Sequence, residues 1–170
     1  MEETGRTIFC VLSKYFWVLG IFMTSVPVFT ARKAAKDYVR ENPDLAPGYR
    51  KIFHGYLILL SLPWIVMGIG CIVGGVPSVW HFFNPKDGNP YVLAWFVSNF
   101  IMLAVISYWI FFMGGAQMLI RHHNVLSIDT SNPAVIKLVW TGFLVLGITI
   151  LLIMWIVHIP IGELPYMDTL

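Results

Sequence analysis

Four long apolar segments constrain the fold of this chain more than any other feature of its sequence. They cover residues 8–30, 52–76, 91–120 and 134–159, and each contains at most one Lys, Arg, Asp or Glu. About 20 helical residues, rising 1.5 Å each, cross the ~30 Å hydrocarbon core of a bilayer. Because a backbone in lipid must satisfy its own hydrogen bonds, we expect helices rather than open strands. The sequence predicts an all-α integral membrane protein whose four transmembrane helices form one domain over residues 1–170.

The balance of apolar and charged residues excludes a soluble domain. Hydrophobic residues make up 58% of the chain and charged residues 12%. The usual charged share of a globular protein is about 25%, so a soluble fold would have too few charges to cover this much apolar surface. The net charge is only +2, and nucleic acid is therefore not an expected partner.

The connection between the first two apolar segments holds six of the eleven basic residues: Arg32, Lys33, Lys36, Arg40, Arg50 and Lys51. Short basic loops stay on the cytoplasmic side of a membrane. We therefore predict that both termini lie on the non-cytoplasmic side, with the plasma (inner) membrane as the expected location. Anionic lipids at the cytoplasmic face are the expected partners of four of these side chains, Arg32, Lys33, Lys36 and Arg40.

Two local signals predict where helices end and begin. Residues 31–41 are mostly good helix formers, so we expect the first helix to extend into the cytoplasm until Asn42 and Pro43 stop it. Asn132 followed by Pro133 is typical of a helix start, and this pair is expected to cap the fourth helix.

The five histidines divide between the two predicted faces of the membrane. His54 and His122 belong to the inner face and start at similar depth, so they are candidate ligands of a haem b or neighbours of a bound quinone. His81 and His158 belong to the outer face and are candidate ligands of a metal ion. Neither pair has the i,i+4 spacing of a helical metal motif, and ordinary boundary histidines are the alternative for both. The sequence requires no cofactor.

Small residues gather at one end of the second apolar segment, where Gly70 and Gly74 form a GxxxG motif. Glycines let helix backbones approach closely, so this face is the expected packing contact. The motif leaves open whether the contact lies within the chain or between chains.

Ionisable side chains are missing from the middle of every predicted span. Lys14 is near the outer end of its helix, within reach of the headgroups. Ion-coupled carriers and proton pumps need an ionisable group near the midplane, and no residue has a catalytic signature. We therefore expect a non-catalytic integral subunit that packs into and stabilises a larger membrane complex, with other membrane subunits as its partners. The expected setting is an energy-converting or oxidoreductase assembly.

Three alternatives remain at this point. The chain could be an electron-transfer anchor that binds haem b or quinone through its inner histidines, or a subunit that contributes an outer-face metal site. It could also be a small homo-oligomeric channel or carrier, which would require a polar face around Asn99 and Gln117 to line a pore.

Overall fold

Four long helices form the body of the protein in a computed structural model that describes residues 2–126 and 130–157. They are α1 (Glu2–Glu41), α2 (Ala46–Ile72), α3 (Pro90–Phe112) and α6 (Pro133–Ile156). Each is long and apolar enough to cross a membrane. The prediction of an all-α integral membrane protein with four transmembrane helices is therefore confirmed.

The first helix extends well beyond the predicted span. It has 40 residues, which correspond to about 60 Å at 1.5 Å per residue, roughly twice the thickness of a hydrocarbon core. It ends at Glu41, immediately before Asn42 and Pro43, as predicted. A residue that precedes proline is biased away from the helical region, which explains why the helix stops there.

The second helix begins earlier than the predicted residue 52. A short 3-10 helix, η1 (Pro43–Leu45), leads directly into α2 at Ala46, with Pro47 in its first turn. Proline is tolerated in the first turn because the N–H that it lacks would have no partner in the helix. The prolines therefore start this helix instead of delaying it.

The third apolar segment is not one helix. α3 ends at Phe112, and a separate helix, α4 (Gly115–Arg121), follows Gly114. Gly114 has a φ of 71°, a left-handed conformation that glycine adopts without the penalty paid by other residues. A four-residue helix, α5 (His123–Leu126), completes this corner.

The start of α6 follows the predicted capping pattern. The Asn132 side chain accepts a hydrogen bond of 2.9 Å from the Ala134 N–H, and Pro133 is in the first turn. The helix ends at Ile156, and the predicted end near residue 159 lies outside the described residues.

The connection between α2 and α3 contains two 3-10 helices, η2 (Val79–Phe83) and η3 (Pro85–Asp87). Phe82 is completely buried in an apolar cluster that includes Met67 and Phe96. Lys86 donates a hydrogen bond of 3.2 Å to the Ile156 carbonyl oxygen. The connection is thus tied both to the core and to the end of α6.

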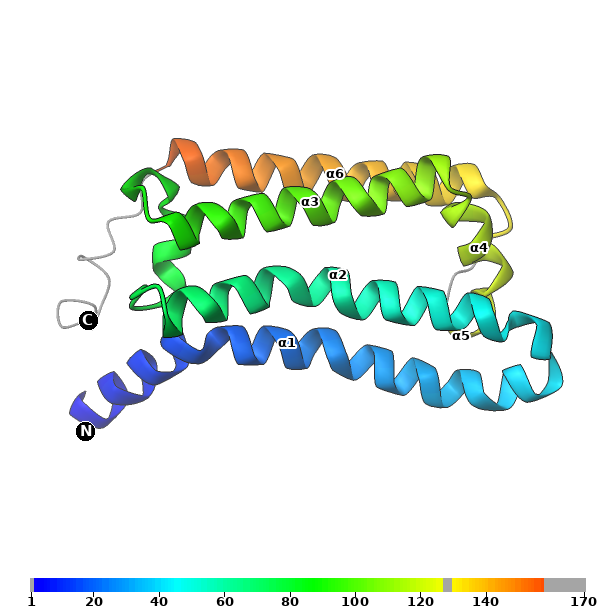
Figure 1. The fold of residues 1–170 in the computed structure, drawn as a ribbon, viewed down its shortest axis with the longest axis horizontal. Coiled ribbons are helices and arrows are strands. Elements are labelled where there is room, and N and C mark those ends of the chain that lie inside the picture. Colours follow the sequence, from blue (N-terminus) through cyan, green and yellow to red (C-terminus); the bar gives the residue numbers. More distant parts are fainter. Residues whose placement is uncertain (1, 127–129, 158–170) are drawn as a thin grey trace.

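The long helices lie beside one another in the order α1, α2, α3 and α6 (Figure 1). α1 packs along α2, α2 along α3, and α3 along α6, whereas α1 and α6 are on opposite sides of the α2–α3 pair. In the most apolar window of α6 only 6% of the residues are buried, compared with 33% in α2. The chain therefore forms an open row of helices that leaves α6 largely uncovered by its own residues.

Candidate functional site

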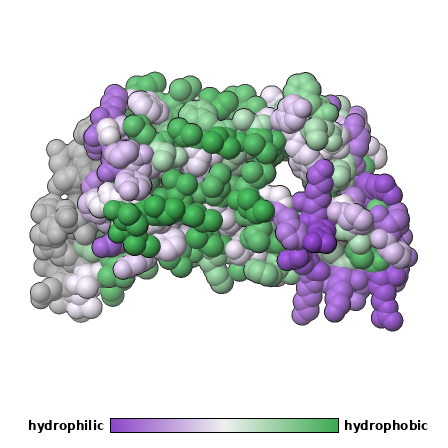
Figure 2. All heavy atoms as spheres, viewed as in Figure 1, coloured by the Kyte–Doolittle hydropathy of each residue, from purple (hydrophilic) through white to green (hydrophobic). Residues whose placement is uncertain are grey.

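The end of the row that carries most of the basic residues is the best-developed polar region of the described structure. We call it the basic end, and it comprises residues 32–54 and 115–126. Figure 2 shows hydrophilic side chains projecting from this end while the middle of the row is apolar. The four predicted lipid-headgroup residues, Arg32, Lys33, Lys36 and Arg40, are all exposed there.

His122 is the centre of the packing at the basic end. Its side chain is only 3% exposed. Nδ1 lies 2.7 Å from the Met118 carbonyl oxygen, and Nε2 lies 3.2 Å from the Leu45 carbonyl oxygen. Carbonyl oxygens only accept, so a neutral imidazole makes one of these hydrogen bonds and an imidazolium makes both. His122 thus joins the end of α4 to the turn between α1 and α2.

Two residues of α2 shape the space that His122 occupies. Tyr49 is buried, and its ring meets the imidazole edge-on with centroids 4.6 Å apart, while its hydroxyl donates to the His122 carbonyl oxygen at 3.4 Å. Gly48 faces the other side of the ring, where a Cβ would overlap the imidazole. The close approach of α4 to α2 therefore requires a glycine at residue 48.

An ion pair closes the same corner at the surface. Arg121 donates to an Asp44 carboxylate oxygen at 2.9 Å, and both side chains are about two-thirds exposed (65% and 66%). An exposed pair of this kind stabilises a fold by about 0–1 kcal/mol. The corner is therefore held mainly by His122 and its buried contacts.

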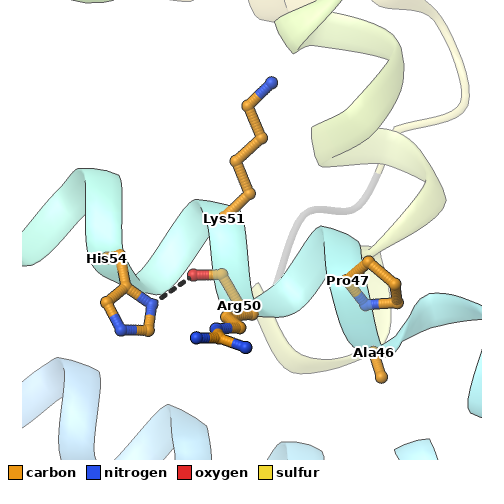
Figure 3. Close-up of a pocket in the computed structure, with 5 residues that line it drawn as sticks. All are labelled: Ala46, Pro47, Arg50, Lys51 and His54. Carbon is orange, nitrogen blue, oxygen red and sulfur yellow. Dashed lines mark hydrogen bonds between the residues drawn. The ribbon is translucent and has the colours of Figure 1, made fainter.

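A shallow hollow of about 620 Å³ lies beside this corner, on the exposed side of α2. It is lined by Ala46, Pro47, Arg50, Lys51 and His54 (Figure 3). The His54 Nδ1–H donates to the Arg50 carbonyl oxygen at 2.7 Å, one helical turn earlier. Arg50 and Lys51 have no carboxylate within ion-pair distance among the described residues. The hollow therefore offers two uncompensated cations to an anion.

The two inner histidines do not share a pocket. His54 lines the hollow beside Arg50, whereas His122 lines a different one with Asp44 and Met118. Both ring nitrogens of His122 already contact backbone carbonyl oxygens. Axial ligation of a haem through this ring would break at least one of those contacts, and the predicted haem or quinone site stays a prediction.

Of the two histidines predicted to bind a metal ion, only His81 lies within the described residues. His81 in η2 is half-buried, and its Nδ1 lies 3.0 Å from the Ser78 hydroxyl. His158 lies outside the described residues. Within residues 2–126 and 130–157, no three His, Cys, Asp or Glu side chains come close enough to hold a metal ion. The metal site at His81 and His158 therefore stays a prediction.

The glycine pair of the GxxxG motif makes its contacts within the chain. A Cβ at Gly70 would come 2.8 Å from Phe82 of η2 and 3.1 Å from the Tyr91 Cβ of α3, and one at Gly74 would overlap the Tyr91 ring. These glycines thus let the end of α2 approach both the connection between α2 and α3 and α3 itself.

Sequence reasoning treated His122 as a possible ligand or an ordinary boundary histidine, and it missed the structural role of this residue. The only glycine that marks this close approach among residues 48, 114 and 115 is Gly48, and the sequence alone does not pair residues 48 and 122. No protein-family model matches the chain, and neither the curated proteins nor the solved structures include a significant match.

Proposed function

We propose that this chain is a non-catalytic integral subunit that packs into a larger membrane complex and stabilises it. The setting we propose is an energy-converting or oxidoreductase complex in the plasma (inner) membrane, with both termini on the non-cytoplasmic side. The observation that carries the proposal is the open row of helices, in which α6 has one long face that its own chain leaves uncovered.

Small residues lie between the large exposed side chains of that uncovered face, such as Leu138 and Val145, and they support a protein partner in addition to lipid. Ala134, Thr141, Gly142 and Thr149 are all exposed on α6, and no atom lies within 4 Å of a Cβ placed at Gly142. Small residues are enriched where membrane helices contact each other, because they let the backbones approach. A helix that faces only lipid gains nothing from them.

The hydrogen bonds of α6 also support a protein partner on this face. The Thr141 hydroxyl donates to the Lys137 carbonyl oxygen at 2.8 Å, so this exposed polar group is satisfied within its own helix, next to Gly142. By contrast, Trp140 donates from Nε1 to the Ser107 hydroxyl at 2.9 Å and joins α6 to α3. The side that joins the row and the proposed docking side are thus different faces of one helix.

Native mass spectrometry of the particle, solubilised gently from its own membrane, tests the proposal. We expect a mass far above that of the 19.3 kDa chain, with heterologous subunits released on dissociation. A mass of one chain, or of a small multiple of it, would contradict the proposal and favour a homo-oligomeric channel or carrier.

A substitution on the uncovered face makes the test specific. Gly142→Leu should reduce the amount of partner that co-purifies at least tenfold while leaving the thermal stability of the isolated chain unchanged. Gly55→Leu is the matched control, because Gly55 of α2 also has nothing within 4 Å of its Cβ position. Equal partner content in both variants would remove the α6 face from the proposal.

A further inference from the structure

One face of α2 combines the basic hollow with a continuous apolar stripe. Pro47, Lys51 and His54 are followed on this face by four isoleucines, and successive members are three, four or seven positions apart. These intervals keep side chains on one side of a helix. All of the members are exposed, and the isoleucines Ile58, Ile65, Ile69 and Ile72 are 64%, 46%, 46% and 66% exposed. This face is therefore polar at the start of α2 and apolar along the rest of the helix.

The polar part of this face suits a phosphate group. Arg50 and His54 are on neighbouring turns and project to the same side of α2, while Lys51, which also lines the hollow, extends away from them in this view (Figure 3). A guanidinium binds phosphate oxygens in a fork, and an ammonium adds a point charge. The only ion pair in the described part of the chain joins Arg121 to Asp44, so both cations of the hollow are available.

The apolar part of the face has the length of a lipid chain. Ile58 and Ile69 are eleven positions apart, which is about 16 Å at 1.5 Å per position and close to half of a ~30 Å hydrocarbon core. The stripe starts one turn below His54. A phosphate in the hollow would therefore sit directly above an acyl chain that runs along the isoleucines through one leaflet.

Residue size argues for lipid over another helix on this face. Contacts between membrane helices are enriched in Gly, Ala, Ser and Thr, whereas the apolar stripe of α2 consists of exposed isoleucines. Large branched side chains keep a second backbone at a distance but pack well against a flexible acyl chain.

We propose that this face of α2 binds one phospholipid with an anionic headgroup. Its phosphate lies between Arg50, Lys51 and His54, and one acyl chain lies along Ile58, Ile65 and Ile69. This site differs from the exposed basic residues of α1 in the hollow that its own residues line, although Phe22, Val26 and Phe29 also continue the face of Lys33 as exposed apolar side chains. The inference does not depend on whether the chain belongs to a larger complex.

Lipid retention measures the proposed site directly. The purified full chain is equilibrated in mixed micelles with dioleoyl phosphatidylglycerol or dioleoyl phosphatidylcholine, and bound lipid is counted by native mass spectrometry. We expect one retained phosphatidylglycerol per chain and at least tenfold less phosphatidylcholine. Equal retention of both lipids would overturn the proposal.

Two double variants separate a specific site from general charge. Arg50→Gln with Lys51→Gln should reduce retention of phosphatidylglycerol at least tenfold. Lys36→Gln with Arg40→Gln removes the same charge from α1, whose basic residues attract anionic headgroups in general, and should lower retention no more than threefold. All four side chains are exposed, so thermal unfolding should be unchanged. Equal losses in the two variants would refute a specific site.

The acyl stripe and the identity of the ligand need their own measurements. Ile58→Ser should lower retention of phosphatidylglycerol several-fold, because it places a polar group against the lipid chain. Inorganic phosphate at millimolar concentration should not displace the lipid. Displacement by phosphate together with an unchanged Ile58→Ser variant would assign the hollow to a free phosphate and overturn the lipid proposal.

Discussion

Trp17 of α1 lies directly over Gly68 of α2, where a Cβ on the glycine would come 2.8 Å from the indole ring. The same interface contains the reverse arrangement, in which Trp64 of α2 covers Gly20 of α1. One turn further along α1, the hydroxyls of Thr24 and Ser61 are 3.3 Å apart. A bulky ring thus fits a gap on the opposite helix twice, which fixes a single antiparallel register for α1 and α2.

Filling the gap at Gly68 should separate the two helices. We expect Gly68→Leu to lower the free energy of unfolding by about 1–3 kcal/mol, the usual cost of an overpacked contact. Trp17→Phe should cost less, because the indole N–H has no hydrogen-bond acceptor among the described residues. Thermal unfolding in detergent measures both effects, and Gly142→Ala, which enters open space, is the control. A Gly68→Leu variant as stable as the control would contradict this register.

The contact between α2 and the connection that follows it, which leads to α3, gives a second prediction. Gly70→Leu should displace Phe82, which is fully buried beside it, and so loosen the connection over residues 77–90. We expect a lower unfolding temperature and faster hydrogen exchange in that connection, while residues 32–54 exchange as before. Unchanged thermal stability would remove the packing role of this glycine.

The membrane fold could be predicted from the sequence because it depends on segment length and apolar content. The four spans, the extension of the first helix to Glu41 and the Asn132 cap follow from local signals. The break at Gly114 could not be placed, because a glycine in an apolar helix is common and its left-handed conformation depends on the contacts of α4. The order of the helices also depends on contacts distant in sequence.

The candidate site was less predictable, and for a physical reason. A histidine at a membrane boundary can be a ligand or a packing residue, and the sequence pattern is the same in both cases. His122 contacts Leu45, which is 77 positions away, and no local sequence pattern predicts that contact. The hollow on α2 was equally hidden: Arg50 and Lys51 were recognised as basic loop residues, but the early start of the helix places them above an exposed stripe.

The corner held by His122 can be tested against the adjacent histidine. His122→Ala would leave the Leu45 carbonyl oxygen without its partner and open a gap beside Tyr49, and an unpaired buried group costs about 1–3 kcal/mol. We expect faster hydrogen exchange over residues 42–49 and easier proteolysis at Arg121. His123→Ala is the control, because that side chain is exposed and its one hydrogen bond within the described residues is to the Ile120 carbonyl oxygen. Equal effects of the two substitutions would show that His122 does not hold the corner.

The connection between α2 and α3 should lose stability in mild acid because of His81. Burial lowers the pKa of His81 from its usual value of 6.5, although the hydrogen bond with Ser78 and the charge of Asp87 act in the opposite direction. The unfolded connection therefore binds a proton more readily than the folded one. The contribution of neutral His81 to stability is complete above pH 6.5 and decreases as the pH falls through the lowered pKa.

Hydrogen exchange of residues 78–88 should accordingly become faster between pH 7.5 and 5, after correction for the intrinsic rate. His81→Gln keeps a polar side chain that does not titrate, so its exchange should show no such change with pH. The same acceleration in the wild type and in His81→Gln would assign the effect to another group.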